Sequence, residues 1–173
     1  FALPPGLAFG VAQKPMLRRM REDRPGRGRY FDLRAFEAGL DRSQTPNTPA
    51  VSLLYALDAQ LARVHEEGIE PRWARHRAMA ERVWEWVDEM RDRGVRVETF
   101  APEGHRSPTV TCVRLPNDTT GPTVCSALRN RGFAVAPGYG STKDHFIRIG
   151  HMGDHTVEEL NALLEALEEV FGV

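Results

Sequence analysis

Apolar residues recur every three or four positions over two long consecutive stretches, a spacing that predicts two amphipathic helices. We expect Thr48 to cap the first helix and Pro49 to take its first position, where a missing N–H costs nothing. Gly68 is expected to end this helix, Pro71 to begin the second helix and Gly94 to close it. The apolar stripe of the first helix consists of Ala50, Leu54, Leu57, Leu61 and Val64.

From Val95 onward, short β-branched runs bounded by proline and glycine replace the helical spacing. They predict strands at VRVETF, SPTVTCVRLP, FAVAPG and HFIRIG. Helices are expected at KPMLRRMRE near the start of the chain, at PTVCSALRNRG, and at the end of the chain, where Thr156 and Glu159 form a capping box. Two long helices followed by the order β-β-α-β-β-α predict an α+β fold, with helices on one face of a small, mostly antiparallel sheet.

Composition and charge narrow the class of protein. The 173 residues include 23 Lys and Arg against 24 Asp and Glu, and this formal net charge of -1 offers no footprint for nucleic acid or an anionic membrane. A local arginine run is broken by Pro25 and Gly26 and is interpreted as a solvated turn. It consists of Arg18, Arg19, Arg21, Arg24, Arg27 and Arg29. No stretch reaches the roughly 20 consecutive apolar residues of a membrane-spanning helix, and two cysteines without a zinc or redox spacing indicate a reducing cytoplasm.

The strand predicted at HFIRIG carries the first candidate for a binding site. Side chains alternate along a strand, so Ile147 and Ile149 share one face while Phe146 and Arg148 share the other. If the isoleucines pack against the helices, Arg148 points away from the core. Its guanidinium then lies either on a solvated face or at the lip of a cleft, where it can hold a carboxylate or phosphate through two parallel hydrogen bonds. The residues alone leave both interpretations open.

The second candidate is the segment SQTPNTPAV, at the start of the first long helix. The free N–H groups and positive dipole end of a helix N-terminus suit a phosphate. Thr45, Asn47 and Thr48 would add hydroxyl and amide donors to such a site. The alternative is that Thr48 serves only as the helix cap.

Histidine, cysteine and tryptophan offer weaker signals. His145, His151 and His155 lie close together in sequence, but their spacing matches neither a helical metal pair nor a Cys/His knuckle, so no metal site is expected. Cys112 in a predicted strand and Cys125 in a predicted helix are interpreted as small apolar groups. The second long helix carries three tryptophans that are interpreted as packing residues. These are Trp73, Trp84 and Trp86.

Five segments, in register over most of the chain, resemble the C-terminal half of class V pyridoxal-phosphate aminotransferases. They are ALPPGLAF, TPNTPAVSLLYALDAQL, WARHR, PTVTCVRLP and FIRIGHMG. The closest likeness is to the alanine–glyoxylate, serine–glyoxylate and serine–pyruvate group. A single segment of this kind is weak evidence for a family, whereas five segments in the same order argue against chance similarity. The resemblance implies the C-terminal portion of a fold-type I enzyme with pyridoxal 5'-phosphate as its cofactor.

The resemblance also implies roles for individual residues. Arg148, in FIRIGHMG, matches the arginine that binds the substrate α-carboxylate. Thr48, in TPNTPAV, matches a residue that hydrogen-bonds the cofactor phosphate of the other subunit in a homodimer, and Asn47 is expected to do the same. Thr45 stands where the alanine–glyoxylate group often has a phosphate-binding tyrosine, and this departure sets it apart from the other two.

The family pattern places the Schiff-base lysine in a serine-rich segment just before ALPPGL, ahead of Phe1. Lys14 and Lys143, the lysines of this chain, lie in other contexts, so the chain alone is expected to be inactive. By the resemblance, residues 1–43 are the tail of the large cofactor-binding domain, residues 44–94 the linking helices and residues 95–173 the small α+β domain.

The resemblance implies that the full-length protein moves an amino group from alanine or serine to glyoxylate or pyruvate as a homodimer. From the charge, hydropathy and cysteine count, we expect a cytoplasmic protein without nucleic-acid or membrane partners. One alternative is a non-catalytic α+β module derived from a transaminase. Another is a different class V enzyme such as a cysteine desulfurase, which needs a nucleophilic cysteine on an accessible loop.

Overall fold

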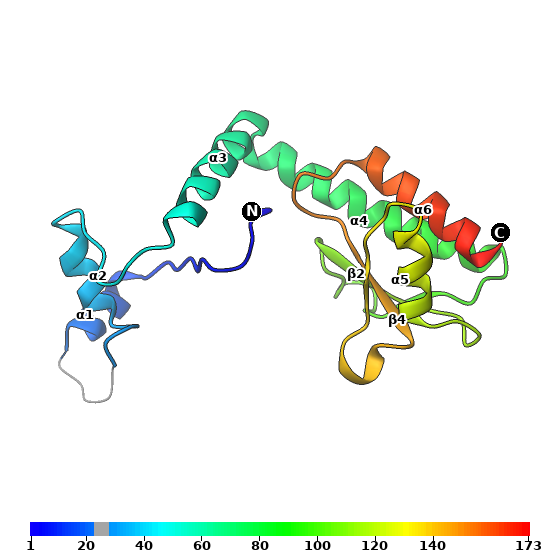
Figure 1. Cartoon of the computed structure of the whole chain (residues 1–173), viewed down its shortest axis with the longest axis horizontal. Helices are drawn as coiled ribbons and strands as arrows, with labels where there is room; N and C mark the ends of the chain where they lie inside the picture. Colours follow the sequence, from blue (N-terminus) through cyan, green and yellow to red (C-terminus); the bar gives the residue numbers. More distant parts are fainter. Residues whose placement is uncertain (23–27) are drawn as a thin grey trace. The chain divides into compact units, whose positions relative to one another are not determined.

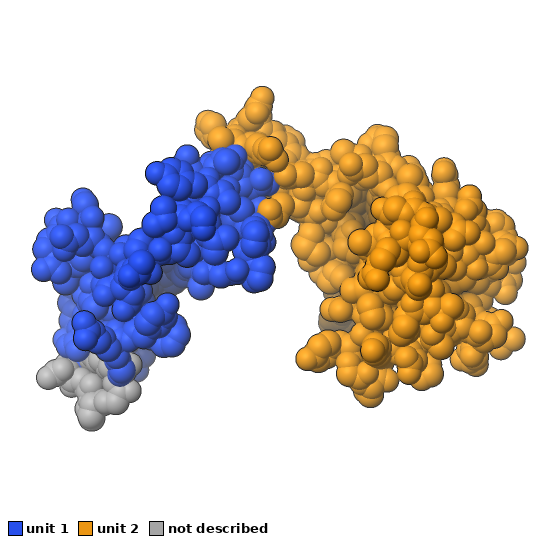
Figure 2. All heavy atoms as spheres, in the orientation of Figure 1, with its two compact units in different colours: residues 1, 3–61 blue, residues 2, 62–173 orange. Residues whose placement is uncertain are grey.

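The computed structural model describes residues 1–22 and 28–173 and divides into two compact units (Figure 2). Unit 1 comprises residues 1 and 3–61, and unit 2 comprises residues 2 and 62–173. The central part of the arginine run, which we interpret as a solvated turn, lies outside the described residues.

Unit 1 contains α1 (Lys14–Arg21), α2 (Leu33–Leu40) and most of α3 (Val51–Glu67). The short helix predicted at KPMLRRMRE is confirmed as α1. An ion pair of 2.6 Å between Arg21 and Glu37 joins α1 to α2. None of the buried hydrophobic side chains of the described chain belongs to unit 1, so this unit has no apolar core of its own.

The start of α3 differs from the prediction. The helix begins at Val51, and its first helical hydrogen bond runs from Leu54 N to Ala50 O at 3.0 Å. Ala50 therefore occupies the cap position, and Thr48 lies two residues before it. The predicted apolar stripe is also not buried in this structure, because Leu54 is 44% and Leu61 45% exposed.

Gly68 separates the two long helices, as predicted. It is the single residue between α3 and α4 (Ile69–Asp92), and its φ of 86° is a left-handed conformation that favours glycine. The second helix begins two residues earlier than expected. Pro71 still fits, because it lies in the first turn, where backbone N–H groups have no partner inside the helix.

An ion-pair cluster that the sequence did not predict holds the junction between α3 and α4 at Gly68. The buried side chain of Arg72 donates to Glu67 at 2.7 Å and to Asp154 at 2.8 Å. Arg75 donates to Glu67 at 2.8 Å and to the carbonyl oxygen of Gly153 at 3.1 Å. The hydrogen bond from Arg75 is the main cause that lowers the pKa of Glu67. The cluster thereby links the last turn of α3, the first turns of α4 and the loop before α6.

The sheet of unit 2 has four strands in the order β1-β2-β4-β3, and every neighbouring pair is antiparallel. The central strands are β2 (Val110–Arg114) and β4 (Phe146–Gly150), which are labelled in Figure 1. The runs VRVETF and FAVAPG form only two-residue strands, β1 (Glu98–Thr99) and β3 (Ala136–Pro137). Both lie at sheet edges, where one partner strand instead of two supports them.

Three helices cover one face of this sheet: α4, α5 (Gly121–Arg129) and α6 (Val157–Phe171). Their apolar side chains form one core with Val113, Ile147 and Ile149 of the central strands. The capping box of α6 is confirmed, because Glu159 N donates to Thr156 Oγ1 at 3.2 Å and Thr156 N donates to Glu159 Oε2 at 3.1 Å. The predicted α+β fold, with helices on one face of an antiparallel sheet, is therefore confirmed.

The predicted domain limits at residues 43 and 94 remain a prediction. Within unit 2, however, α4 supplies Met79, Val83, Trp86, Val87 and Met90 to the core, so the second of the predicted linking helices is an integral part of this unit. Among the described helices, none combines the length and apolarity needed to cross a membrane.

Candidate functional site

Strand β4 presents Arg148 on the face of the sheet that the helices leave open. Ile147 and Ile149 are completely buried on the helical face, whereas Arg148 is exposed. The alternation expected from HFIRIG is thus observed, with one qualification: Phe146 shares the open face with Arg148 but is only 4% exposed. Two side chains account for its burial. Phe100 meets its ring edge-on at 5.1 Å, and the Arg114 guanidinium lies 4.8 Å from its ring centre.

Small residues surround Arg148 on the open face. The strand register places Cys112 of β2 opposite Arg148 on one side and Ala136 of β3 opposite it on the other. Gly150, two residues further along β4, has no side chain. Directly opposed side chains in a sheet lie close together, so larger residues at these positions would cover the guanidinium. The register therefore leaves Arg148 open to a ligand.

The Arg148 guanidinium is anchored at one nitrogen. Its Nε donates to the carbonyl oxygen of Pro137 at 2.9 Å. Within the described residues, its two Nη groups have no protein partner. The edge formed by Nη1 and Nη2 carries two parallel donors, which is the geometry that pairs with both oxygens of a carboxylate.

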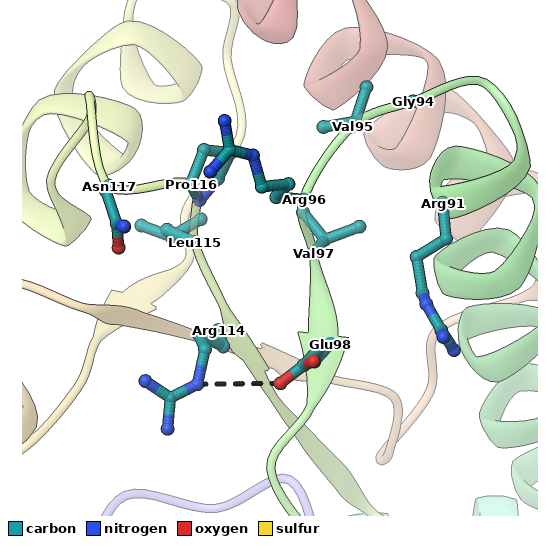
Figure 3. Close-up of a pocket in the computed structure, with 10 residues that line it drawn as sticks. All are labelled: Arg91, Gly94, Val95, Arg96, Val97, Glu98, Arg114, Leu115, Pro116 and Asn117. Atoms are coloured by element: carbon teal, nitrogen blue, oxygen red, sulfur yellow. Dashed lines mark ion pairs between the residues drawn. The ribbon is translucent and has the colours of Figure 1, made fainter.

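Arg114, a second arginine on the open face, is engaged elsewhere. It pairs with Glu98 at 3.7 Å, as Figure 3 shows. Both residues line a pocket of about 340 Å³ between the start of β1 and the end of β2, to which Arg91 and Arg96 also contribute. In Figure 3 the three arginines of this pocket point in different directions and do not converge on one point. The pocket therefore lacks the focused donor set that Arg148 provides.

The candidate phosphate-binding residues precede α3 in unit 1. The Thr45 hydroxyl donates to the carbonyl oxygen of Asn47 at 2.7 Å, so it stabilises the local turn. Thr48 is exposed and Asn47 is half-buried. Asn47 and Thr48 thus bring an amide and a hydroxyl close to the N-terminus of α3, and donors of these kinds suit a phosphate monoester. The first N–H of the helix is already engaged, because Val51 N donates to Pro49 O at 2.9 Å. Arg148, by contrast, belongs to unit 2.

The three histidines do not gather into a site. His145 and His155 are exposed, whereas His151 is completely buried. Among the described residues, no group of three or more His, Cys, Asp or Glu side chains is arranged to hold a metal ion.

His151 instead belongs to a buried hydrogen-bond chain that sequence reasoning missed. Its Nδ1 lies 3.3 Å from the carbonyl oxygen of Pro108, which can only accept, so Nδ1 carries the proton. Neutral Nε2 then accepts from the Thr111 hydroxyl at 2.9 Å, and Thr111 in turn accepts from Trp84 Nε1 at 3.0 Å. The only signal in the sequence was the position of His151 one residue after β4.

Acidification is expected to weaken unit 2 through His151. Burial lowers the pKa of His151 in the folded protein, whereas histidine in an unfolded chain has a pKa of about 6.5. Below that value the unfolded chain binds more protons than the folded one, so the free energy of unfolding should fall as the pH drops. Urea unfolding at about pH 7.5 and about pH 5.5 measures this loss.

The matched variants are His151→Gln, which cannot titrate, and His105→Gln, which removes an exposed histidine. His151→Gln should show a smaller loss of stability on acidification than the parent, and His105→Gln the same loss as the parent. Equal losses in all three proteins would contradict the assignment.

Both cysteines are poor nucleophiles in this fold. Cys125 is buried in α5, and Cys112 is half-buried in β2. Burial raises the pKa of both thiols, and this effect exceeds the opposing influence of nearby arginines. Neither cysteine lies on an accessible loop, which disfavours the desulfurase alternative.

The tryptophans divide into three environments. Trp86 is completely buried, Trp84 is half-buried and bonded to Thr111, and Trp73 is 62% exposed. The interpretation as packing residues is confirmed for Trp86 and wrong for Trp73 within this structure.

The chain resembles known proteins both in sequence and in fold. No family model matches the chain. It is 34% identical over 169 residues to an uncharacterized aminotransferase of Methanocaldococcus jannaschii, covering 96% of this chain and 43% of that protein. It is 33% identical over 157 residues to the L-aspartate–glyoxylate aminotransferase of Paracoccus denitrificans, covering 90% of this chain and 38% of that protein.

Among solved structures, the ureidoglycine–glyoxylate aminotransferase of Bacillus subtilis matches with a TM-score of 0.69 and 31% identity, over 86% of this chain and 38% of that one. The chain thus spans about two fifths of the length of the relatives it matches. The matched part of these enzymes is their C-terminal part, as the resemblance predicted. The chain belongs to the class V aminotransferases, of which it represents the C-terminal half.

Proposed function

We propose that the full-length protein transfers an amino group from a small amino acid, alanine or serine, to a 2-oxo acid, glyoxylate or pyruvate. The observation that carries this proposal is the free Nη edge of Arg148 on the open sheet face. The names of two relatives, which act on aspartate or ureidoglycine with glyoxylate, support a glyoxylate-type acceptor. The amino donor and the 2-oxo acid acceptor each carry a carboxylate next to the reacting carbon. One arginine can therefore bind the substrate in both half-reactions.

Arg148 would act by binding and orientation. Two parallel hydrogen bonds between its Nη groups and the carboxylate fix two points of the substrate, so the bonds at Cα take a defined direction. The Pro137 carbonyl restricts the movement of the guanidinium, because it accepts a hydrogen bond from Nε. Since the site binds only the part common to all α-amino acids, the choice of side chain must depend on other residues.

The cofactor of this proposal is pyridoxal 5'-phosphate, whose ring acts as an electron sink for the substrate Cα when it is bound. Asn47 and Thr48 would hold its phosphate close to the N-terminus of α3. Thr45 contributes by holding the turn, since its hydroxyl is committed to Asn47 O. We further propose that the protein works as a homodimer in the cytoplasm and that Asn47 and Thr48 serve the phosphate of the partner subunit.

The proposal is tested by assaying the full-length protein with glyoxylate or pyruvate and matched pairs of donors. L-Alanine and L-serine are compared with ethylamine and ethanolamine, which lack the carboxylate. Loss of the paired carboxylate should lower kcat/KM by about a hundredfold or more. Absence of transfer from any amino acid would contradict the activity, whereas equal turnover of alanine and ethylamine would contradict the role of Arg148.

The non-catalytic module is not favoured, because the relatives of this chain are aminotransferases. A full-length protein without amino-transfer activity and without pyridoxal absorbance would revive it.

A further inference from the structure

Thr142 closes the turn that follows β3. Tyr139 N donates to Thr142 Oγ1 at 3.0 Å, and the same hydroxyl donates to Tyr139 O at 2.8 Å. The backbone adds one bond, from Thr142 N to Tyr139 O at 3.1 Å. The Thr142 side chain thus makes two of the three hydrogen bonds that tie these residues together, over the short helix η1 (Gly140–Thr142).

The turn is packed directly against the residue that precedes it. Gly138 N donates to Phe146 O at 2.7 Å, which ties the turn to β4. A Cβ placed on Gly138 would lie 2.1 Å from the carbonyl oxygen of Thr142, so no other residue fits there without a shift of the backbone. A displacement of the Thr142 backbone would therefore also change the position of Gly138.

Gly138 follows Pro137, whose carbonyl oxygen accepts from Arg148 Nε at 2.9 Å. Pro137 ends an edge strand of two residues, which is supported by β4 on one side alone. Such a short strand has few ladder bonds of its own, so the turn after it helps to hold this carbonyl, together with α5, which packs against β3. A continuous series of contacts therefore connects Thr142 to Arg148. The Thr142 side chain holds the turn, the turn packs against Gly138, and the carbonyl of the adjacent Pro137 accepts from Arg148 Nε.

We propose that Thr142 is a positioning residue for Arg148, and that it acts through the Gly138 turn and the Pro137 carbonyl to hold the Nη1–Nη2 edge toward the substrate. The inference rests on the proposed role of Arg148 as the carboxylate anchor. An arginine side chain loses considerable rotamer freedom on binding, and an anchor at Nε removes that freedom before the ligand arrives. The carboxylate is then bound end-on, because the Nε side of the guanidinium is already occupied.

The test uses the full-length enzyme and the variants Thr142→Ala, Thr142→Ser and Arg148→Ala. Thr142→Ala removes both side-chain hydrogen bonds of the turn and should raise KM for the amino acid about five- to tenfold. The value of kcat should change less than about twofold, because the contact between Arg148 and the carboxylate is weakened in the ground state and the transition state alike. Thr142→Ser keeps the hydroxyl and should restore most of the parent KM. Thr119→Ala, on the connection between β2 and α5, is the matched control for loss of a threonine side chain and should leave KM unchanged.

The inhibition constant of propionate, a bare carboxylate, gives a second readout and should rise in parallel with KM. The midpoint of urea unfolding identifies any general loss of stability. The positioning role of Thr142 is wrong if Arg148→Ala raises KM and Thr142→Ala does not, or if Thr142→Ser fails to restore the parent KM. The proposed role of Arg148 in binding the carboxylate is not affected by that result. If Arg148→Ala also leaves KM and propionate binding unchanged, the proposed function of Arg148 fails instead.

Discussion

Replacement of Arg148 with alanine is expected to lower kcat/KM of the full-length enzyme by a factor of about a hundred to a thousand, or ~3–4 kcal/mol of transition-state stabilisation. The side chain offers two unpartnered Nη donors on an open sheet face, and a carboxylate that loses both also loses its orientation. Initial rates with alanine and glyoxylate measure the effect. The fold should be unaffected, because the exposed side chain adds little to the core.

Two variants make this experiment specific. Arg148→Lys keeps the charge but has no fork, so it should recover only a small part of the lost kcat/KM. Arg114→Ala removes the second arginine of the same face, which is paired with Glu98 and covers Phe146, and should leave kcat/KM near the parent value. If the arginine-to-alanine changes at 114 and 148 had equal effects, Arg148 would be part of a general positive field and not a specific anchor.

Replacement of Trp86 with alanine is expected to lower the free energy of unfolding by about 3–5 kcal/mol. The indole is completely buried, stacks on Phe171 with 6.4 Å between ring centres and donates from Nε1 to Glu168 at 3.2 Å. The variant therefore creates a large cavity between α4 and α6 and also removes a hydrogen bond. Urea unfolding of parent and variant, followed by circular dichroism, measures the difference.

The matched control lies on the same helix. Trp73 is 62% exposed, so Trp73→Ala removes the same chemical group from α4 without opening a core cavity. Its expected cost is about 1 kcal/mol or less. Comparable losses at positions 73 and 86 would contradict the assignment of Trp86 to the core.

Sequence patterns predicted the elements that local chemistry determines. The reciprocal bonds of Thr156 and Glu159 involve only neighbouring residues, and they were found as predicted. The alternation that separates Ile147 from Arg148 needs no knowledge of neighbouring strands, and it too was found. By contrast, the start of α3 was misplaced by two residues: Val51 N donates to Pro49 O, and the first helical bond runs to Ala50 O, neither of which the preference of threonine for caps could reveal.

The parts that sequence could not predict depend on register and long-range contact. The bond from Arg148 to Pro137 exists because β3 pairs with β4 in one particular register, and nothing in the run FAVAPG specifies it. The chain from Trp84 through Thr111 to His151 joins a helix, a strand and a loop that lie far apart in sequence. The two-residue lengths of β1 and β3 likewise reflect their place at the sheet edges, which no local pattern reveals.

The open face of the sheet has a consequence for how such a protein can change over evolutionary time. Each central strand divides its residues between two tasks, with Ile147 and Ile149 serving the core while Arg148 and its neighbour Cys112 face outward. Substitutions of exposed side chains on the outward side leave the packed layer intact, so their effects on folding are small. The surroundings of Arg148 can therefore change from one protein to another while the domain stays folded.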